Sequence, residues 1–342
     1  MSPETKVLTF GEIMMRLSPS DHGRLEQAHE LQVNYGGAEA NVAFSLAYQG
    51  DQAAFVSIVP QNRIGDCALR SLSSVGVDVS RVVREGDRLG TYFFEVGASE
   101  RPNSCVYDRK YSAMNLASHA DLDWDKILDG VDAFYVSGVT PAVSPEMAVA
   151  AKEALEACRS RHITTICDLN YRKLWTPEAA QKVMKGLLPL VDICIANDED
   201  APSCLGISYG AGSLACGIEE KDAYVQIAEE LSRTYGVKMV ASVIRDIRSV
   251  EDSDWMGLVY ADGCAHFSPV HHVHVLEGVA AGDAFAAGLI HALMHGADLD
   301  EAASYAIAAS VLKLTIRGDS NYVTADEIAQ VAHKGSGLRV SR

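Results

Sequence analysis

The chain has 342 residues, of which 48% are hydrophobic and 22% are charged, an ordinary composition for a globular protein with a large core. Its formal net charge of −17 argues against nucleic acid and anionic membranes as partners, so an anionic ligand would need local basic residues. No apolar run reaches the length of a membrane span. Eight cysteines without a Cys-x-x-Cys pair, and an N-terminus unlike a signal peptide, predict reduced thiols in a cytoplasmic protein.

The first part of the chain predicts strands and helices that do not alternate regularly. The elements expected there are a strand at Lys6–Phe10, a helix at Val42–Gln49, a buried strand at Ala53–Val59 and a helix at Asp66–Val75. Two alternating segments, 90–96 and 104–109, predict a hairpin with its turn at 97–103. The polar, alternating stretches are expected to form a small β-lid inserted into a larger domain.

From residue 133 onward, apolar strands and helices alternate. The strands are expected at 133–137, 164–168, 193–196 and 239–243, and the helices at 145 onward, near 177 and at 225–235. This alternation is typical of an α/β protein, in which a parallel sheet is covered by helices on both faces. Functional sites in such folds lie at the carboxyl ends of the strands.

The segment 279–290 predicts an anion-binding loop that opens a helix. The small residues Ala280, Ala281 and Gly282 let backbone N–H groups approach an anion, and the positive end of the helix dipole points to the same place. The carboxylate of Asp283 would repel a phosphate, so its presence here needs a reason. It is explained if Asp283 accepts the proton of a hydroxyl group that attacks the phosphate. The loop therefore favours a small-molecule kinase, although a capped helix start with an acidic first turn explains it equally well.

Motifs spread over nearly the whole chain resemble those of the ribokinase-like (PfkB) carbohydrate kinases, and are most similar to the 2-keto-3-deoxygluconate kinases among them. The motifs occur at 35–43, 60–66, 75–78, 88–92, 101–102, 106–109, 168–175, 277–283, 313–316 and 318–321. The resemblance implies a ribokinase-like three-layer α/β/α domain with a mostly parallel central sheet. It would span 1–342 as a single domain, with the lid segments at approximately 12–34 and 88–115.

The same resemblance implies a kinase that uses ATP and Mg²⁺, and it leaves a monovalent cation open. It implies transfer to the terminal hydroxyl of 2-keto-3-deoxygluconate with Asp283 as the base. Ala280, Ala281 and Gly282 would supply the cradle for the transferred phosphoryl group. A lid with one uncovered sheet face also suggests a homodimer.

Candidate substrate-binding residues come from four motifs. Arg109 and Arg172 are expected to bind a carboxylate, because a guanidinium matches its geometry, although surface ion pairs would explain either arginine alone. Tyr92 and Tyr107 could donate hydrogen bonds from their hydroxyl groups to the sugar, or could simply pack across the hairpin. The remaining residues that the resemblance assigns to the sugar, together with these tyrosines, are Gly36, Gly37, Asn41, Tyr92 and Tyr107.

Candidate nucleotide and metal residues are assigned less directly. Those expected near the nucleotide are Asn197, Ser242, Arg245, Gly282 and Asn321. Asp200 stands where the family motif has Glu, and would bind Mg²⁺ through water, unless the acidic turn is only a solvated surface. His271, His272 and His274 have no third ligand at a suitable spacing, so no zinc site is predicted there.

The phosphate loop departs from the family pattern at three positions, which are Glu277, Gly278 and Ala280. A Cβ at residue 280 is expected to crowd the phosphate or to oppose a positive φ, but it leaves the backbone donor in place. Two alternatives to a sugar-acid kinase therefore stay open. One is a kinase for a neutral sugar such as fructose, and the other is a sugar-acid-binding protein with impaired transfer.

Overall fold

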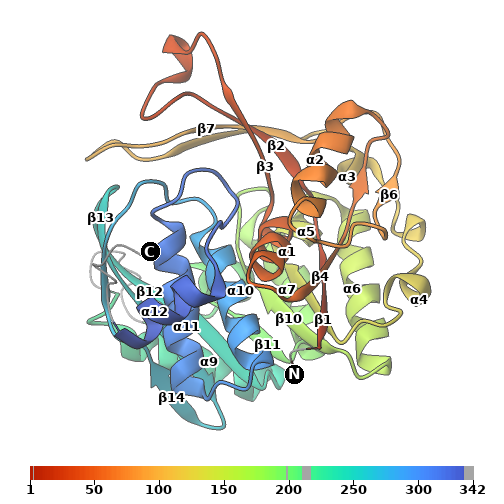
Figure 1. Cartoon of the computed structure of the whole chain (residues 1–342). Coiled ribbons are helices and arrows are strands. Elements are labelled where there is room, and N and C mark those ends of the chain that lie inside the picture. Colours follow the sequence, from red (N-terminus) through yellow and green to blue (C-terminus); the bar gives the residue numbers. More distant parts are fainter. Residues whose placement is uncertain (3, 198, 210–216, 335–342) are drawn as a thin grey trace.

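A computed structural model describes residues 1–2, 4–197, 199–209 and 217–334 of the chain (Figure 1). Its central sheet has nine strands in the order β14-β13-β12-β11-β10-β9-β1-β4, and β15 also pairs with β13. The strands from β12 to β4 pair in parallel, whereas β13, β14 and β15 pair antiparallel. The bounds are β1 Lys6–Phe10, β4 Gln52–Val56, β9 Ala133–Ser137, β10 Thr164–Asp168, β11 Ile193–Ile195, β12 Met239–Ser249, β13 Asp252–Ala261, β14 Cys264–Phe267 and β15 His271–His274.

Helices cover both faces of this sheet. Successive residues of a strand point to opposite sides, so each buried strand contributes apolar side chains to both faces. In β1, Val7 belongs to one buried apolar cluster and Leu8 to another. The Val7 side packs against α1 Ala38–Tyr48, α2 Arg63–Ser73, α10 Ala281–Met294, α11 Leu299–Lys313 and α12 Ala325–Lys334. The Leu8 side packs against α3 Ala113–Leu116, α4 Trp124–Ile127, α5 Val139–Val143, α6 Pro145–Ser160, α7 Pro177–Leu187, α8 Asp200–Leu205 and α9 Lys221–Tyr235. The predicted three-layer α/β/α architecture is confirmed.

Several predicted elements have different bounds in the structure; the helices expected at 42–49 and 225–235, for example, each begin four residues earlier. The strand expected at 53–59 is interrupted at Ser57, so β4 is followed by a separate strand, β5 Ile58–Val59, which pairs with β6 Val83–Arg84. The helix expected at 66–75 begins three residues earlier, because the Asn62 side chain accepts hydrogen bonds from the amides of Ile64 and Gly65. Three short 3₁₀ helices complete the described structure, at Leu25–Gln27, His119–Asp121 and Leu188–Leu190.

A second, four-stranded sheet lies above the main body in Figure 1 and is called the small sheet below. Its order is β3-β2-β7-β8, so it combines two segments that are far apart in the sequence. The predicted hairpin is present as β7 and β8, which pair antiparallel. Its strands are β2 Met14–Ser18, β3 Gln32–Gly36, β7 Thr91–Glu95 and β8 Ser104–Asp108.

Buried charges join the small sheet to the main body. Arg16 of β2 is 1% exposed and forms ion pairs with Glu277 and Asp319, the latter at 3.2 Å. The Tyr92 hydroxyl of β7 donates to Asp319 as well. Breaking a buried pair of this kind leaves an unpaired charge, which costs about 3–5 kcal/mol. These buried ion pairs therefore hold the small sheet in position, because separating them has a high free-energy cost.

The described cysteines are all free, while Cys216 lies outside the described residues. Within the ranges given above, the helices are too short or too polar to cross a lipid bilayer.

The first turn of α10 is strained at its N-cap. Ala280 has φ 62° and ψ 14°, a left-handed conformation, and α10 has no side-chain cap. The expected conflict between a Cβ and a positive φ is thus real, but alanine adopts the conformation instead of preventing it. For a residue with a Cβ this geometry costs roughly 1–2 kcal/mol.

We expect Ala280→Gly to raise the free energy of unfolding by about 1 kcal/mol, because glycine adopts positive φ without a steric penalty. Chemical denaturation of the full chain measures this change. The matched control is Ala281→Gly in the first turn of α10, which should destabilise the protein by about 0.5–1 kcal/mol. A loss of stability in both variants would contradict the assigned strain.

Candidate functional site

A cavity of about 280 Å³ lies between the small sheet, the N-terminus of α10 and the carboxyl ends of central strands. This is the place where the α/β architecture predicts a ligand. Strands β2, β7 and β8 contribute its upper wall, and α10 contributes the opposite wall. Its lining residues are Met14, Gly37, Ala38, Asn41, Tyr92, Phe94, Asn103, Cys105, Tyr107, Arg109, Val139, Asn170, Arg172, Gly278, Val279, Ala280, Asp283 and Asp319.

The N-terminus of α10 presents free backbone donors at this cavity. The first helical hydrogen bond runs from Ala284 N to Ala280 O, so the amides of residues 281–283 precede the helical ladder. No acceptor for these three amides occurs among the described residues. A Cβ at Gly282 would meet no atom within 4 Å, so the space beside this turn is open. The arrangement is that of an anion-binding helix start.

Asp283 is buried at the same turn and is held by one hydrogen bond. Asn41 Nδ2 donates to Asp283 Oδ2 at 2.7 Å, and Asn41 Oδ1 accepts from Gly37 N at 3.4 Å. Burial raises the pKa of Asp283 to about 6, while the bond from Asn41 opposes that rise. Such a carboxylate is ionised at neutral pH but basic enough to accept a proton. Asn41, which was expected to bind the sugar, thus orients Asp283.

Arg172 is the exposed cation beside a group of buried carboxylates. Its Nη1 donates to the Tyr171 carbonyl at 2.9 Å, and no carboxylate forms an ion pair with it in the described part of the chain. Burial raises the pKa of three carboxylates around the cavity, and the charge of Arg172 opposes each rise. These are Asp168, Asp200 and Asp283. The guanidinium is therefore available to an anionic ligand.

Arg109 differs from Arg172 because its charge is already paired. Its Nε donates to Glu12 Oε2 at 2.9 Å, its Nη2 donates to the same oxygen, and Ser112 Oγ donates to Glu12 Oε1. Both members of the ion pair are buried. Arg109 lines the cavity but brings no net charge to it. The two arginines that the sequence treated alike are therefore not equivalent.

The two predicted tyrosines lie in the cavity wall. Their ring centroids are 5.8 Å apart across the β7–β8 pair, so packing across the hairpin is confirmed. Tyr92 is buried and its hydroxyl donates to Asp319, whereas Tyr107 is 43% exposed. Tyr107 is thus the freer of the two hydroxyls.

Glycine is required at both positions of the Gly-Gly pair. A Cβ at Gly36 would lie 2.5 Å from Asp319 Cβ, and one at Gly37 would lie 2.0 Å from the Glu12 carbonyl oxygen. Only Gly37 lines the cavity. The pair therefore allows close approach of β3 and α1 to neighbouring segments.

Three of the five predicted nucleotide residues lie around β11 and β12, outside the cavity described above. Ser242 is buried and donates to the Ala196 carbonyl at 2.5 Å. Arg245 pairs with Glu199 at 2.6 Å, and Asn197 Oδ1 accepts from the Val243 amide at 2.9 Å.

Asn321 is placed differently from the others. It is 2% exposed and donates to Ser45 Oγ of α1 at 3.0 Å. The side chains of Asn321 and Ser242 therefore both form hydrogen bonds inside the protein. Of the five predicted residues, Asn197 and Arg245 are half-buried with their side chains already hydrogen-bonded, whereas Gly282 is exposed.

Asp200 lies at the start of α8 and meets the requirements for holding Mg²⁺ through water. Its Oδ1 accepts from the Tyr171 amide at 2.8 Å, and its Oδ2 accepts from Asn197 Nδ2 at 3.3 Å. Burial raises the pKa of Asp168, and the charges of Asp200 and Asp283 raise it further. A divalent cation would relieve this repulsion, and carboxylate oxygens are the donors that Mg²⁺ prefers. The donor set therefore fits magnesium.

Three site residues were missed by the sequence interpretation. Asp319 lines the cavity, Glu12 neutralises Arg109, and Asp168 joins the buried carboxylates. Asp168 and Asp319 stand in motifs that carry the family resemblance, which was the available signal. Glu12 had no such signal, because its role depends on a partner 97 residues away.

Comparisons with known proteins agree with this geometry. The family model described as pfkB family carbohydrate kinase matches residues 4–325. A 2-dehydro-3-deoxygalactonokinase of Haloferax volcanii is 32% identical over 331 residues, covering 96% of this chain and 97% of the relative. A 2-dehydro-3-deoxygluconokinase of Bacillus subtilis is 28% identical, covering 91% of this chain and 90% of the relative.

A solved structure is similar over nearly the whole fold. The 2-dehydro-3-deoxygluconokinase of Thermotoga maritima superimposes with a TM-score of 0.92 at 44% identity, covering 97% of this chain and 99% of that one. The predicted ribokinase-like architecture is thus confirmed. With a family match over most of its length and a kinase-like helix start at its cavity, the chain belongs to the pfkB family of carbohydrate kinases and is a sugar kinase.

Proposed function

We propose that this sugar kinase phosphorylates a sugar acid, with 2-keto-3-deoxygluconate (2-dehydro-3-deoxygluconate) as its substrate and ATP with Mg²⁺ as its donor. The observation that carries this proposal is Arg172, a cavity arginine without an acidic partner among the described residues. A carboxylate ligand would satisfy it, whereas a neutral sugar would not. The printed names of the related 2-dehydro-3-deoxy sugar-acid kinases support the same substrate class.

In the proposed reaction, the terminal hydroxyl oxygen of the sugar acid attacks the γ-phosphorus of ATP. The new P–O bond forms as the bond to the β-phosphate oxygen breaks, and ADP leaves with that electron pair. The hydroxyl proton passes to Asp283, which Asn41 holds in place. The free amides at residues 281 and 282 donate to the transferred phosphoryl group and stabilise its charge. Bound Mg²⁺ would neutralise phosphate charge, held through water by Asp200 with Asn197 beside it.

Two features of the chain stay predictions alongside this function. A monovalent-cation requirement and a cytoplasmic location are both compatible with the structure, and each needs its own measurement. ADP release with and without added K⁺ addresses the first, and cell fractionation addresses the second.

Asp283→Asn should lower kcat strongly while leaving the fold intact. Loss of a positioned base costs about 10²- to 10⁴-fold in kcat, and asparagine can still accept the hydrogen bond from Asn41. In the native chain, kcat/KM should rise as the pH increases through about 6, because Asp283 must lose its proton to act as the base.

Stability should change with pH in the opposite direction. Burial raises the folded-state pKa of Asp283 from 3.8 to about 6, so the folded state binds more protons between these values. Its contribution to stability is therefore lost as the pH rises from about 4 to 6. Asp283→Asn should remove the rise in kcat/KM near pH 6 and reduce the pH dependence of stability, which ADP release and thermal unfolding can measure. A pH–rate profile without a rise near 6 would rule out the assigned base.

Arg172→Ala should raise the KM for the sugar acid by roughly 10- to 100-fold, because a hydrogen bond between charged groups contributes about 1.5–3 kcal/mol. Its stability should change little, since the side chain is exposed. Arg109→Ala should instead destabilise the protein, because it leaves Glu12 buried without its partner.

The matched control is Arg248→Ala, which removes an exposed arginine paired with Asp254 on β12 and β13. Kinetics with 2-keto-3-deoxygluconate and with fructose should be measured for each variant. An unchanged KM for the acid in Arg172→Ala would overturn the carboxylate assignment. Better turnover of fructose than of the acid would establish a neutral-sugar kinase instead.

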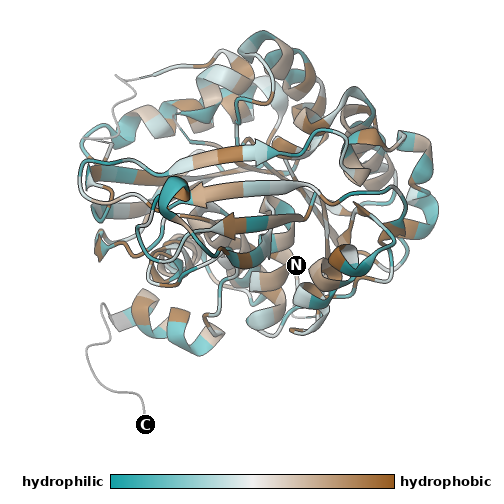
Figure 2. Ribbon diagram, turned by 90° about the horizontal axis from the view of Figure 1, so that it is seen from above, coloured by the Kyte–Doolittle hydropathy of each residue, from teal (hydrophilic) through white to brown (hydrophobic). Residues whose placement is uncertain are grey.

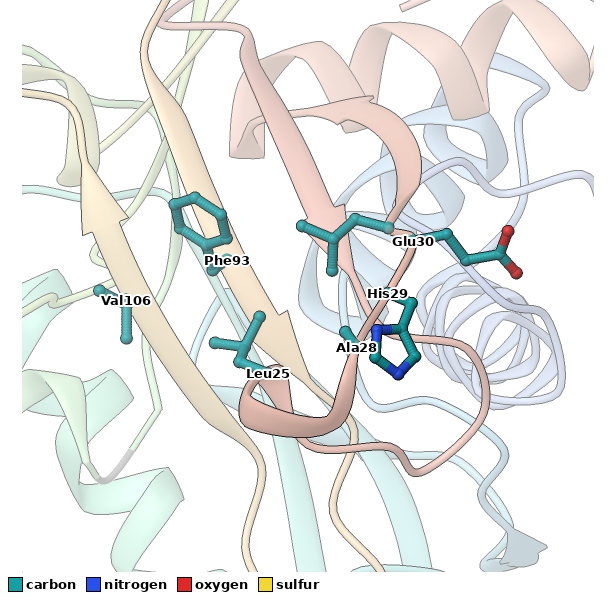
Figure 3. Close-up of a pocket in the computed structure, with 7 residues that line it drawn as sticks. Leu25, Ala28, His29, Glu30, Phe93 and Val106 are labelled. Carbon is teal, nitrogen blue, oxygen red and sulfur yellow. The ribbon is translucent and has the colours of Figure 1, made fainter.

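We also propose that the small sheet acts as a lid and that two copies of the chain pair through its outer face. The inner face holds Tyr92 and Phe94 against the cavity, so the alternate residues point outward. Phe93 and Val106 line an open apolar groove there with Leu25, as Figure 3 shows, and hydrophobic positions are visible across the sheet in Figure 2. Val106 is 53% exposed. A second copy would cover this face.

Val106→Glu should convert a dimer into a monomer, because it places a charge in the wall of the apolar groove. Sedimentation of the native chain and the variant gives both masses directly. The control is Val149→Glu, which changes another exposed valine, on α6 and outside the small sheet. A monomeric native chain would exclude the homodimer.

A further inference from the structure

A cluster of two histidines and a carboxylate lies at the C-terminal end of α10, away from the cavity at its start. We propose that Asp51, His291 and His295 form a binding site for a divalent transition-metal ion, with Zn²⁺ as its best-suited occupant. His291 and His295 are one helical turn apart and lie on the same side of α10. Asp51 comes from the turn between α1 and β4, so three separate positions converge.

The donor atoms already face one another. His291 Nδ1 lies 2.8 Å from Asp51 Oδ2, and His295 Nε2 lies 3.0 Å from Asp51 Oδ1. All three ligand atoms are within 4.8 Å of one another. Donors of a tetrahedral zinc ion with bonds of about 2.1 Å are about 3.4 Å apart. The two histidine–carboxylate contacts would therefore need to lengthen by about 0.5 Å to admit the ion.

The imidazole rings are held in place by stacking. The rings of His291 and His295 stack at 4.2 Å, and the ring of Tyr305 stacks on His291 at 4.9 Å. The Tyr305 hydroxyl donates to Gln49, which fixes that ring from the other side. Two imidazoles and one carboxylate form a donor set typical of zinc and similar ions.

The surroundings of the cluster favour a cation. The carboxylate of Asp51 is 2% exposed, and its described ion pairs involve only the two histidines, with no Lys or Arg among them. The last carbonyl groups of α10 carry the negative end of the helix dipole. Each contribution attracts a positive ion.

The geometry also supplies an entry path and an open coordination position. The side chain of His295 is 42% exposed, so an ion can reach the cluster from solvent and keep a water as its fourth ligand. A bound ion would tie the end of α10 to the α1–β4 turn. Because it would bind the folded state selectively, it would stabilise the fold without entering the kinase reaction.

The test is a titration of the reduced, metal-free full chain, first with Zn²⁺ and then with Co²⁺, in the absence of nucleotide. We expect one ion per chain and a thermal midpoint that rises with Zn²⁺ concentration. The absorption of the Co²⁺ form should lack a thiolate charge-transfer band, which excludes binding by cysteines. The absence of a saturable site in calorimetry would overturn the proposal.

Variants locate the ion. His295→Ala, at an exposed position, should weaken Zn²⁺ affinity by at least about tenfold and remove the thermal shift. The control is His272→Ala, another exposed imidazole between carboxylates, Asp252 and Asp254, which should bind Zn²⁺ like the native chain. Equal affinity in His295→Ala and the native chain would show that the ion binds elsewhere, or that the cluster forms hydrogen bonds only. Circular dichroism of both variants confirms their folding.

Discussion

The cavity depends on one local arrangement, a buried carboxylate beside the free amides of a helix start. The α10 N-terminus attracts negative charge, and Asp283 in its first turn provides some, which burial partly neutralises by raising the pKa of the carboxyl to about 6. An arriving phosphate would compete for the same positive field. Asn41 and Arg172 make the arrangement tolerable, since one donates to Asp283 and the other lowers its pKa.

The charged groups around the cavity differ in burial and in pairing. Buried ion pairs such as Arg16 with Glu277 and Arg109 with Glu12 neutralise their own charges and hold the small sheet in place. Arg172 stays at the exposed rim, where a ligand can reach it. The separation lets the fold keep its shape while one cation is left for recognition. A net charge of −17 makes that local cation more important, because the global field repels anions.

Much of the fold and part of the site could be predicted from sequence patterns. Strand–helix alternation after residue 133 predicted the parallel sheet, and the segments at 90–96 and 104–109 predicted the β7–β8 pair. The small residues before Asp283 indicated the helix start that the structure contains. Local patterns could not reveal which arginine is neutralised, because the pairing of Arg109 with Glu12 depends on two distant segments meeting.

The sequence also could not show which polar side chains form hydrogen bonds inside the protein. Asn321 and Ser242 have polar groups suited to a nucleotide, yet both donate to internal acceptors. The cluster of Asp51 with two histidines could not be predicted, because Asp51 and His291 are 240 residues apart in the sequence. The histidines near residue 272 are close in sequence, so a shared site could be considered for them from spacing alone. Contacts of this kind depend on packing and not on spacing.

The sequence by itself determined the α/β class, the family and the presence of an anion-binding helix start, because periodicity and short motifs are encoded locally. Only the tertiary structure decided which polar groups are free. It paired Arg109, left Arg172 open, and placed Ala280 in a left-handed conformation that its side chain disfavours. The physical reason is that desolvation and pairing of charges depend on neighbours brought together by folding, which no local pattern specifies.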